Sequence, residues 1–182
     1  MDQDGVINIL QRCIRVGVVS QIDTNNHTVR VDFGEDGATS YDLPVLALNT
    51  RQNKDYNLPD IGEDVLCLFL PGGEENGFVL GSFYAGEVKP PIANANVRMV
   101  KFSDGTTVKY NRESHDLDVV IEGTHIHANR NNVDITTPMQ VNIKTANATI
   151  TASGDIAINS GGDMSITSGG AVFIQGAKVN IN

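Results

Sequence analysis

The feature that most constrains this fold is a period of about eight residues in the C-terminal part of the chain. Pairs of mostly apolar residues, separated by one residue, begin at Leu117 and recur as far as Val179, with first members seven or eight residues apart. Short polar stretches rich in Gly, Ser, Asn and Thr separate the pairs, as in residues 160–163. This period indicates very short strands, each presenting two side chains inward before the chain turns.

A single chain of this kind buries too little to be stable alone. About 18 apolar side chains cover nearly 70 residues; burying each contributes about 1.5–3 kcal/mol, whereas ordering each residue costs about 1.5 kcal/mol. Three chains that share one axis improve this balance and leave no lateral strand edge exposed. We therefore predict an intertwined trimeric β-helix, a triangular prism, over residues 113–182. The alternative is a monomeric β-solenoid, which usually has longer coils.

The predicted trimer core takes one or both members of most pairs. It consists of Leu117, Val119, Val133, Ile135, Val141, Ile143, Ile150, Ile156, Ile158, Met164, Ile166, Val172, Ile174, Val179 and Ile181.

The first part of the chain has a different character, because it carries most of the charged and aromatic residues. Residues 1–15 have apolar residues at helical spacing and predict a short amphipathic helix. Residues 16–93 contain several short alternating strands, which favour a small OB-fold barrel. Residues 94–112 predict a connecting β-hairpin around Asp104-Gly105. The fold class is therefore all-β, with one short N-terminal helix.

Composition excludes several functions. The formal net charge is −9, so the chain repels phosphate, and the barrel lacks the basic groove and stacking aromatics that OB folds use on nucleic acid. We expect no nucleic-acid partner. Cys13 and Cys67 have no metal-site spacing, which indicates reduced core residues. No apolar run approaches the length of about 20 residues that spans a bilayer, so we expect no conventional integral membrane protein.

His125 and His127 occupy one pair of the repeat, eight residues after Leu117 and eight before Val133. In a trimer that spacing predicts six imidazoles around the threefold axis, a donor set that suits one iron ion per trimer, or another transition metal such as nickel or zinc. The alternatives are a solvated first turn or an outward-pointing pair.

The order of these segments resembles a known family. An N-terminal helix, an OB barrel, the hairpin VKFSDGTTVKY and an octad β-helix occur together in the central spike, or baseplate assembly protein V, of contractile phage tails, and in VgrG-like proteins of related injection systems. The resemblance implies a homotrimer assembled in the bacterial cytoplasm and located at the tail tip. Its barrels would nucleate the baseplate by binding hub and tube proteins, and its rod would puncture the target envelope when the sheath contracts.

The position of the histidine pair and the end of the repeat differ from the pattern of many family members. Many members carry the histidine pair close to the C-terminus, whereas here 55 residues follow His127. The sequence stops in mid-pattern, so either a separate PAAR-like tip protein covers a blunt end or the chain is truncated.

Only residues 85–116 separate barrel and rod, which leaves no room for the lysozyme domain of some relatives, and we expect no enzyme. The alternative function is a trimeric fibre or adhesin that binds a cell-surface glycan.

Overall fold

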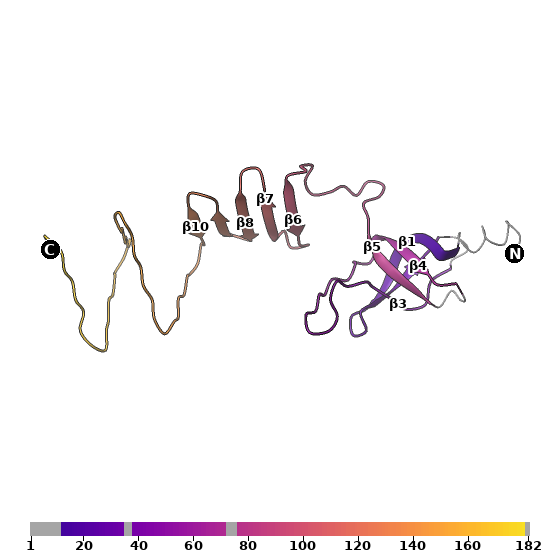
Figure 1. The fold of residues 1–182 in the computed structure, drawn as a ribbon, viewed down its shortest axis with the longest axis horizontal. Helices are drawn as coiled ribbons and strands as arrows, with labels where there is room; N and C mark the ends of the chain where they lie inside the picture. The colour runs from indigo at the N-terminus through magenta and orange to yellow at the C-terminus, as the bar shows by residue number, and fades with distance from the viewer. Residues whose placement is uncertain (1–11, 35–37, 72–75, 181–182) are drawn as a thin grey trace, which may run out of the picture. The chain divides into compact units, whose positions relative to one another are not determined.

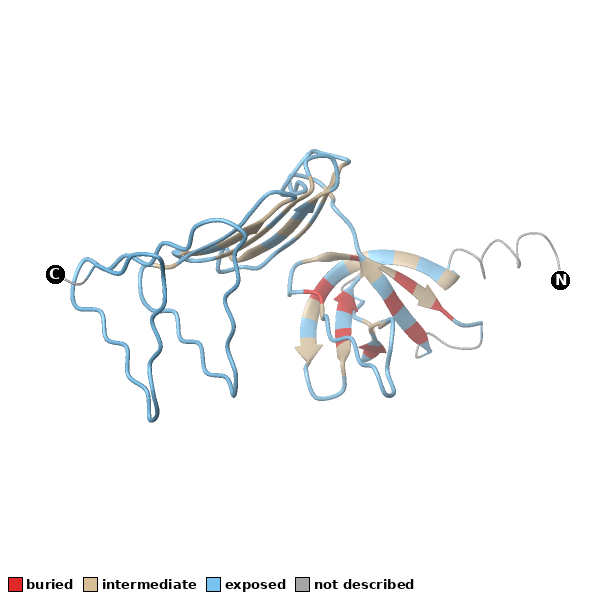
Figure 2. Cartoon of the chain, turned by 60° about the vertical axis from the view of Figure 1, so that its left-hand side comes forward, coloured by how far each residue is buried: buried red, intermediate tan, exposed pale blue. Residues whose placement is uncertain are grey.

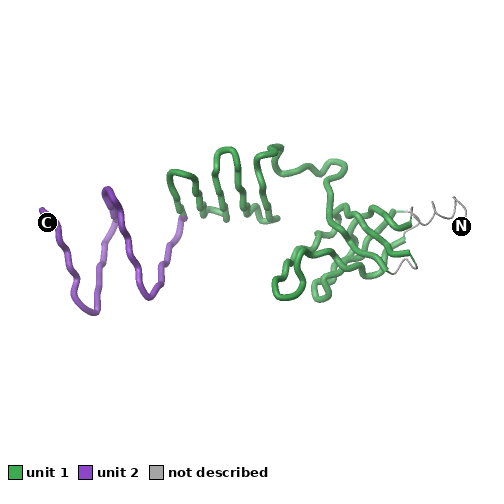
Figure 3. Tube along the Cα trace, in the orientation of Figure 1, with its two compact units in different colours: residues 1–136 green, residues 137–182 purple. Residues whose placement is uncertain are grey.

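A computed structural model describes residues 12–34, 38–71 and 76–180. Within these residues the chain forms ten strands arranged in two five-stranded sheets (Figure 1). The chain divides into a unit of residues 1–136, which holds both sheets, and a unit of residues 137–182 (Figure 3). No helix among the described residues is long and apolar enough to cross a membrane.

The first sheet is a nearly closed barrel. Its strands are β1 (Ile14–Asp23), β2 (Thr28–Asp32), β3 (Leu43–Pro44), β4 (Asp64–Phe69) and β5 (Gly77–Ser82). They lie in the order β3-β2-β1-β4-β5, and each pair of neighbours is antiparallel.

A short contact between the two ends of this sheet brings its edges together. Val45, directly after β3, forms a parallel bridge with Val79 of β5, and the Leu46 amide donates a hydrogen bond of 2.9 Å to the Val79 carbonyl. Because the edge strands meet in this way, few backbone groups are left unpaired at the edges. The architecture agrees with the predicted OB-fold barrel.

The barrel core follows from strict alternation along its strands. In β4, Val65, Cys67 and Phe69 are buried, while the residues between them are only partly buried. Side chains of alternate residues point to opposite faces of a strand, so this alternation places one apolar row inside the barrel (Figure 2). The core cluster consists of Val19, Val29, Val31, Leu43, Val65, Cys67, Phe69 and Val79.

The predicted N-terminal helix over residues 1–15 falls mostly outside the described residues, which begin at 12. Arg12 and Cys13 are helical. Ile14 and Arg15 already belong to β1, where they pair with residues of β4. The barrel therefore begins two residues before the predicted boundary, because these two residues continue the ladder with β4.

The second sheet is an antiparallel meander in which each strand pairs with the next. Its strands are β6 (Val97–Lys101), β7 (Thr107–Asn111), β8 (Asp116–Ile121), β9 (Thr124–Ala128) and β10 (Val133–Thr136). β6 and β7 form the predicted hairpin.

The predicted boundary at residue 113 falls between two paired strands of this sheet. The hairpin and the first three repeats of the octad pattern belong to one sheet, because β7 pairs with β8 along its whole length. A period of eight residues is compatible with a meander, in which a strand of about five residues is followed by a tight turn. It is equally compatible with an intertwined β-helix. Residues 113–136 are thus paired within the chain rather than intertwined.

Residues 138–180 form no strand and are all exposed. Their large apolar side chains project into solvent, with exposed fractions of 82% for Ile143, 77% for Ile150 and 72% for Ile166. The last predicted core residue, Ile181, lies outside the described residues. A segment with this many exposed aliphatic side chains has no core of its own.

Candidate functional site

The β6–β10 sheet has two chemically different faces, which the strand register defines. The mostly apolar face, called the apolar face below, carries Arg98, Val100, Val108, Tyr110, Leu117, Val119, Ile121, Thr124, Ile126, Ala128, Val133 and Ile135. The mostly polar face, called the polar face below, carries Val97, Met99, Lys101, Thr107, Lys109, Asn111, Asp116, Asp118, Val120, His125, His127, Asp134 and Thr136.

The apolar face is uncovered in the single chain. Val133 is 68% exposed and Ile135 is 61% exposed. Contiguous apolar surface of this kind usually marks a protein interface. Four predicted trimer-core residues lie on this face, Leu117 and Val119 on β8 and Val133 and Ile135 on β10, with β9 between the two strands.

His125 and His127 do not share that face in the single chain, and their place on a threefold axis stays a prediction. His127 lies opposite Asp118, and His125 lies opposite Val120, whereas Val119 lies opposite Ile126. The residues that join the apolar face from β9 are therefore Ile126 and Ala128.

Turn length explains the difference. β8 and β9 are joined by two residues, and β9 and β10 by four. An even-numbered loop between antiparallel strands pairs odd with even positions, so residues eight apart in adjacent strands point to opposite faces. Two such turns restore the original face, which is why Val133 again joins Leu117. The prediction of six imidazoles on a threefold axis therefore loses the register argument that supported it.

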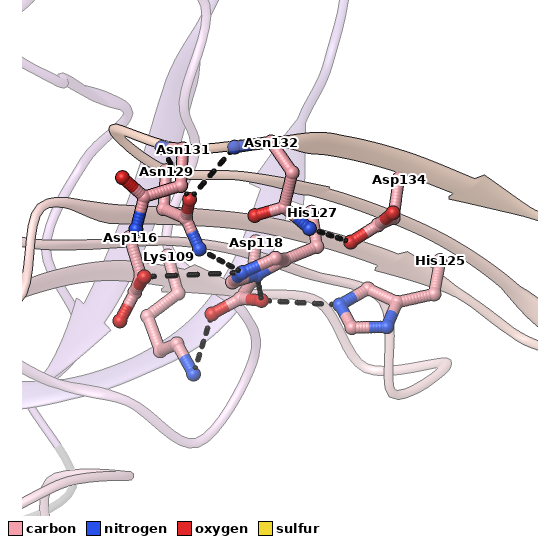
Figure 4. Close-up of polar contacts among 9 residues, drawn as sticks. All are labelled: Lys109, Asp116, Asp118, His125, His127, Asn129, Asn131, Asn132 and Asp134. Atoms are coloured by element: carbon pink, nitrogen blue, oxygen red, sulfur yellow. Dashed lines mark hydrogen bonds and ion pairs between the residues drawn. The ribbon is translucent and has the colours of Figure 1, made fainter. Parts of the chain in front are cut away.

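The polar face instead brings both histidines to one carboxylate (Figure 4). Asp118 Oδ1 lies 2.7 Å from His127 Nδ1 and 3.1 Å from His125 Nε2. Its other oxygen, Oδ2, lies 2.9 Å from Lys109 Nζ. The Asp118 side chain is only 14% exposed, so the four residues form a compact cluster that partly shields the carboxylate from water.

This cluster shifts two pKa values in opposite directions. The hydrogen bond from His127, followed by that from Lys109, holds the pKa of Asp118 well below its usual range. The hydrogen bond to Asp118 raises the pKa of His127, and the charges of Asp116 and Asp134 act in the same direction. Both shifts favour the charged forms and so a charge-assisted contact between the two side chains.

Asp118, His125 and His127 each offer one donor atom, and these atoms lie within 4.8 Å of one another. Sequence reasoning singled out the histidines but missed Asp118. The signal was the two-residue Glu122-Gly123 turn, which sets Asp118 directly opposite His127. Reading that turn as part of a hairpin would have identified the third residue.

The barrel has a second exposed apolar surface, on the outside of β1, β4 and β5. Ile14 pairs with Leu68, which in turn pairs with Phe78. Val16 pairs with Leu66 in the next row. Ile14 is 61% and Val16 59% exposed, and this outer barrel face therefore presents a continuous apolar strip.

Comparison with known proteins gives two matches. Residues 15–84 match the family described as the type VI secretion system/phage-baseplate injector OB domain. The chain is also similar to a spike protein of Escherichia phage P2, with 30% identity over 110 residues that cover 60% of this chain and 51% of the relative. The chain thus spans about half the length of the curated relative it matches. Both matches agree with the resemblance set out from the sequence.

Proposed function

We propose that this chain, in which residues 15–84 match the injector OB domain family and which is similar to a phage spike protein, is the homotrimeric central spike of a contractile tail or injection particle. In this role it is a non-enzymatic structural protein at the tail tip. The barrel connects it to the baseplate hub and tube, and the C-terminal rod meets the target envelope when the sheath contracts.

The observation that carries the trimer is the exposure of the predicted core residues from Val141 to Val179. These side chains lie outside any strand and are all exposed. Each aliphatic side chain left in water forgoes about 1.5–3 kcal/mol of burial. Winding three chains around one axis would cover them, and the exposed apolar face of the β6–β10 sheet also requires a cover.

The barrel supports the contact with the baseplate. The family match covers the barrel strands, and the outer barrel face leaves Ile14, Val16 and Phe78 exposed. We expect the hub to cover this strip, since its residues are too apolar to remain in solvent in an assembled particle. A PAAR-like protein at the far end of the rod would cover the strand edges of a blunt tip.

Light scattering on the purified chain tests the trimer. We expect a mass three times the 19.5 kDa of one chain. Ile135→Lys places a charge on the apolar face and should weaken or abolish the trimer, whereas the matched change Thr136→Lys, on the polar face, should leave the mass unchanged. A wild-type monomer, or equal effects of the two substitutions, contradicts the proposed assembly.

The location is tested on the particle itself. Gold-labelled antibody against the barrel should mark the baseplate end of tails in electron micrographs, and deletion of the gene should yield tails without a complete baseplate. Saturable binding of the isolated trimer to a cell-surface glycan would instead favour a fibre or adhesin.

A further inference from the structure

The polar face of the β6–β10 sheet carries a donor set that the proposed spike function does not use. Asp118 comes from β8, and His125 and His127 come from the neighbouring strand β9. Their side chains converge on one point above the sheet (Figure 4), and one donor atom of each lies within 4.8 Å of the other two.

We infer that Asp118, His125 and His127 bind one divalent transition-metal ion per chain. Two imidazole nitrogens and one carboxylate oxygen form a set typical of zinc, iron, cobalt, nickel or copper, whereas calcium and magnesium prefer oxygen ligands throughout. The strands hold the set rigidly, because Asp118 is paired directly with His127 and His125 lies two residues away on the same face.

The existing contacts show which atoms face the ion. Asp118 Oδ1 contacts His127 Nδ1 at 2.7 Å and His125 Nε2 at 3.1 Å. An ion bound by these three atoms would take the place of the two ring hydrogen bonds to the carboxylate, and any proton on either coordinating nitrogen would be released. Lys109 contacts the other oxygen, Oδ2, at 2.9 Å, so it can orient the carboxylate without occupying the position of the ion.

A second carboxylate lies behind the ring of His127. Asp116 Oδ1 is 3.8 Å from His127 Nε2, and Asn129 Nδ2 is 3.1 Å from the same nitrogen. When Nδ1 binds the ion, Nε2 carries the proton. Asp116 can accept it after moving closer than 3.8 Å, and the Asn129 amide must then turn its NH2 group away from Nε2. Metal-bound histidines commonly donate to a carboxylate in this way.

The charge around the cluster also favours a cation. Asp116 Oδ1 lies 3.8 Å from His127 Nε2, and Asp134 is paired with His127 across the strands. Lys109 contacts Asp118 alone among these carboxylates in the ion pairs of the described residues. Three protein ligands leave open positions for water, so the ion would bind on an accessible surface rather than in a closed cage. This inference does not depend on the trimer, because all three ligands come from one chain.

Calorimetric titration of the full chain with Zn²⁺, after removal of metal with EDTA, tests the site. We expect one Zn²⁺ per chain, and a loss of affinity of about tenfold or more for Asp118→Asn, His125→Ala and His127→Ala. His115→Ala, at the turn before β8, is the matched control and should bind as the wild type does.

Other outcomes overturn the inference. One metal per three chains that is insensitive to Asp118→Asn would point to an axial ring of histidines instead. Binding weaker than about 1 mM, with no change in the variants, would show that the cluster is only a hydrogen-bonded network. His125→Ala serves as the decisive variant if Asp118→Asn fails to fold, since the His125 side chain is the most exposed of the three, at 47%.

Discussion

Asp118 of β8 lies directly opposite His127 of β9, and the carboxylate of the first is 2.7 Å from the ring nitrogen of the second. The pair sits on the polar face of the sheet, turned away from the apolar residues that alternate with it. One sheet thereby separates an exposed apolar face from a polar face that brings charged groups of the same chain together.

The charge of Asp118 sets the titration of His127 in the metal-free protein. We expect Asp118→Asn to lower the pKa of His127 towards its ordinary value, because the substitution removes the strongest interaction that raises it. Asp116→Asn should lower it less, since Asp116 lies 3.8 Å away. The pH dependence of the His127 ring signals in NMR spectra measures both. An unchanged pKa in Asp118→Asn would contradict the contact.

The same pair predicts a pH window for stability. The pKa of Asp118 is lowered in the folded protein. Its contribution to folding stability is therefore complete above the ordinary carboxyl pKa of about 3.9, and it is lost as the pH falls through the lowered pKa. The pKa of His127 is raised, so its contribution is complete below about 6.5 and is lost as the pH rises through the raised value. The contact should therefore stabilise the sheet fully between about pH 4 and 6.5. Hydrogen exchange of the β8 and β9 amides, compared with Asp118→Asn, measures this window.

Leu43 is the largest side chain fully enclosed in the barrel, on the two-residue strand β3. Leu43→Ala should reduce the free energy of unfolding of the barrel by about 2–5 kcal/mol, because it leaves a cavity in a closely packed core. Leu48→Ala is the matched control: that side chain is 91% exposed, and its loss should change stability by less than about 0.5 kcal/mol. Denaturant unfolding compares the two, and equal effects would show that β3 does not close the core.

Gly17 lies where β1 passes closest to the end of β2. A Cβ at this position would lie 2.5 Å from the Asp32 carbonyl oxygen and 2.6 Å from Val31 Cγ1. Gly17→Ala should therefore destabilise the barrel by about 1–3 kcal/mol, the usual cost of overpacking. Amide hydrogen exchange in β1 and β2 should be faster in Gly17→Ala than in the wild type. Gln21→Ala, at an exposed position of β1, is the control and should leave the exchange rates unchanged. Wild-type protection in Gly17→Ala would mean that the strands separate at little cost.

Burial raises the pKa of the Cys67 thiol to about 11. In a Cys13→Ser background, where Cys67 is the remaining cysteine, about one thiol in a thousand would be ionised at pH 8. We expect no reaction with a thiol reagent in the native protein at that pH, and one equivalent after denaturation. Rapid labelling of the native chain would show that the core opens easily.

Local sequence patterns were sufficient for the barrel. In β2, Val29 and Val31 alternate with polar residues, which predicts the side of that strand that is buried. The apolar pairs after Val141 predict that a single chain of the rod buries too little to be stable. These inferences rest on side-chain spacing within one strand, which the backbone geometry of a strand converts directly into faces.

The placement of the histidine pair required the tertiary structure. The octad spacing of Leu117, His125 and Val133 is the same whether the chain winds or folds back, but folding back through an even-numbered turn sends His125 to the opposite face. The spacing of apolar residues along the chain was enough to predict the barrel core and the octad repeat. The pairing of β8 with β9 decided that Asp118, a residue no motif singled out, is the partner of both histidines, because contact across a sheet depends on register and turn length rather than on distance in the sequence.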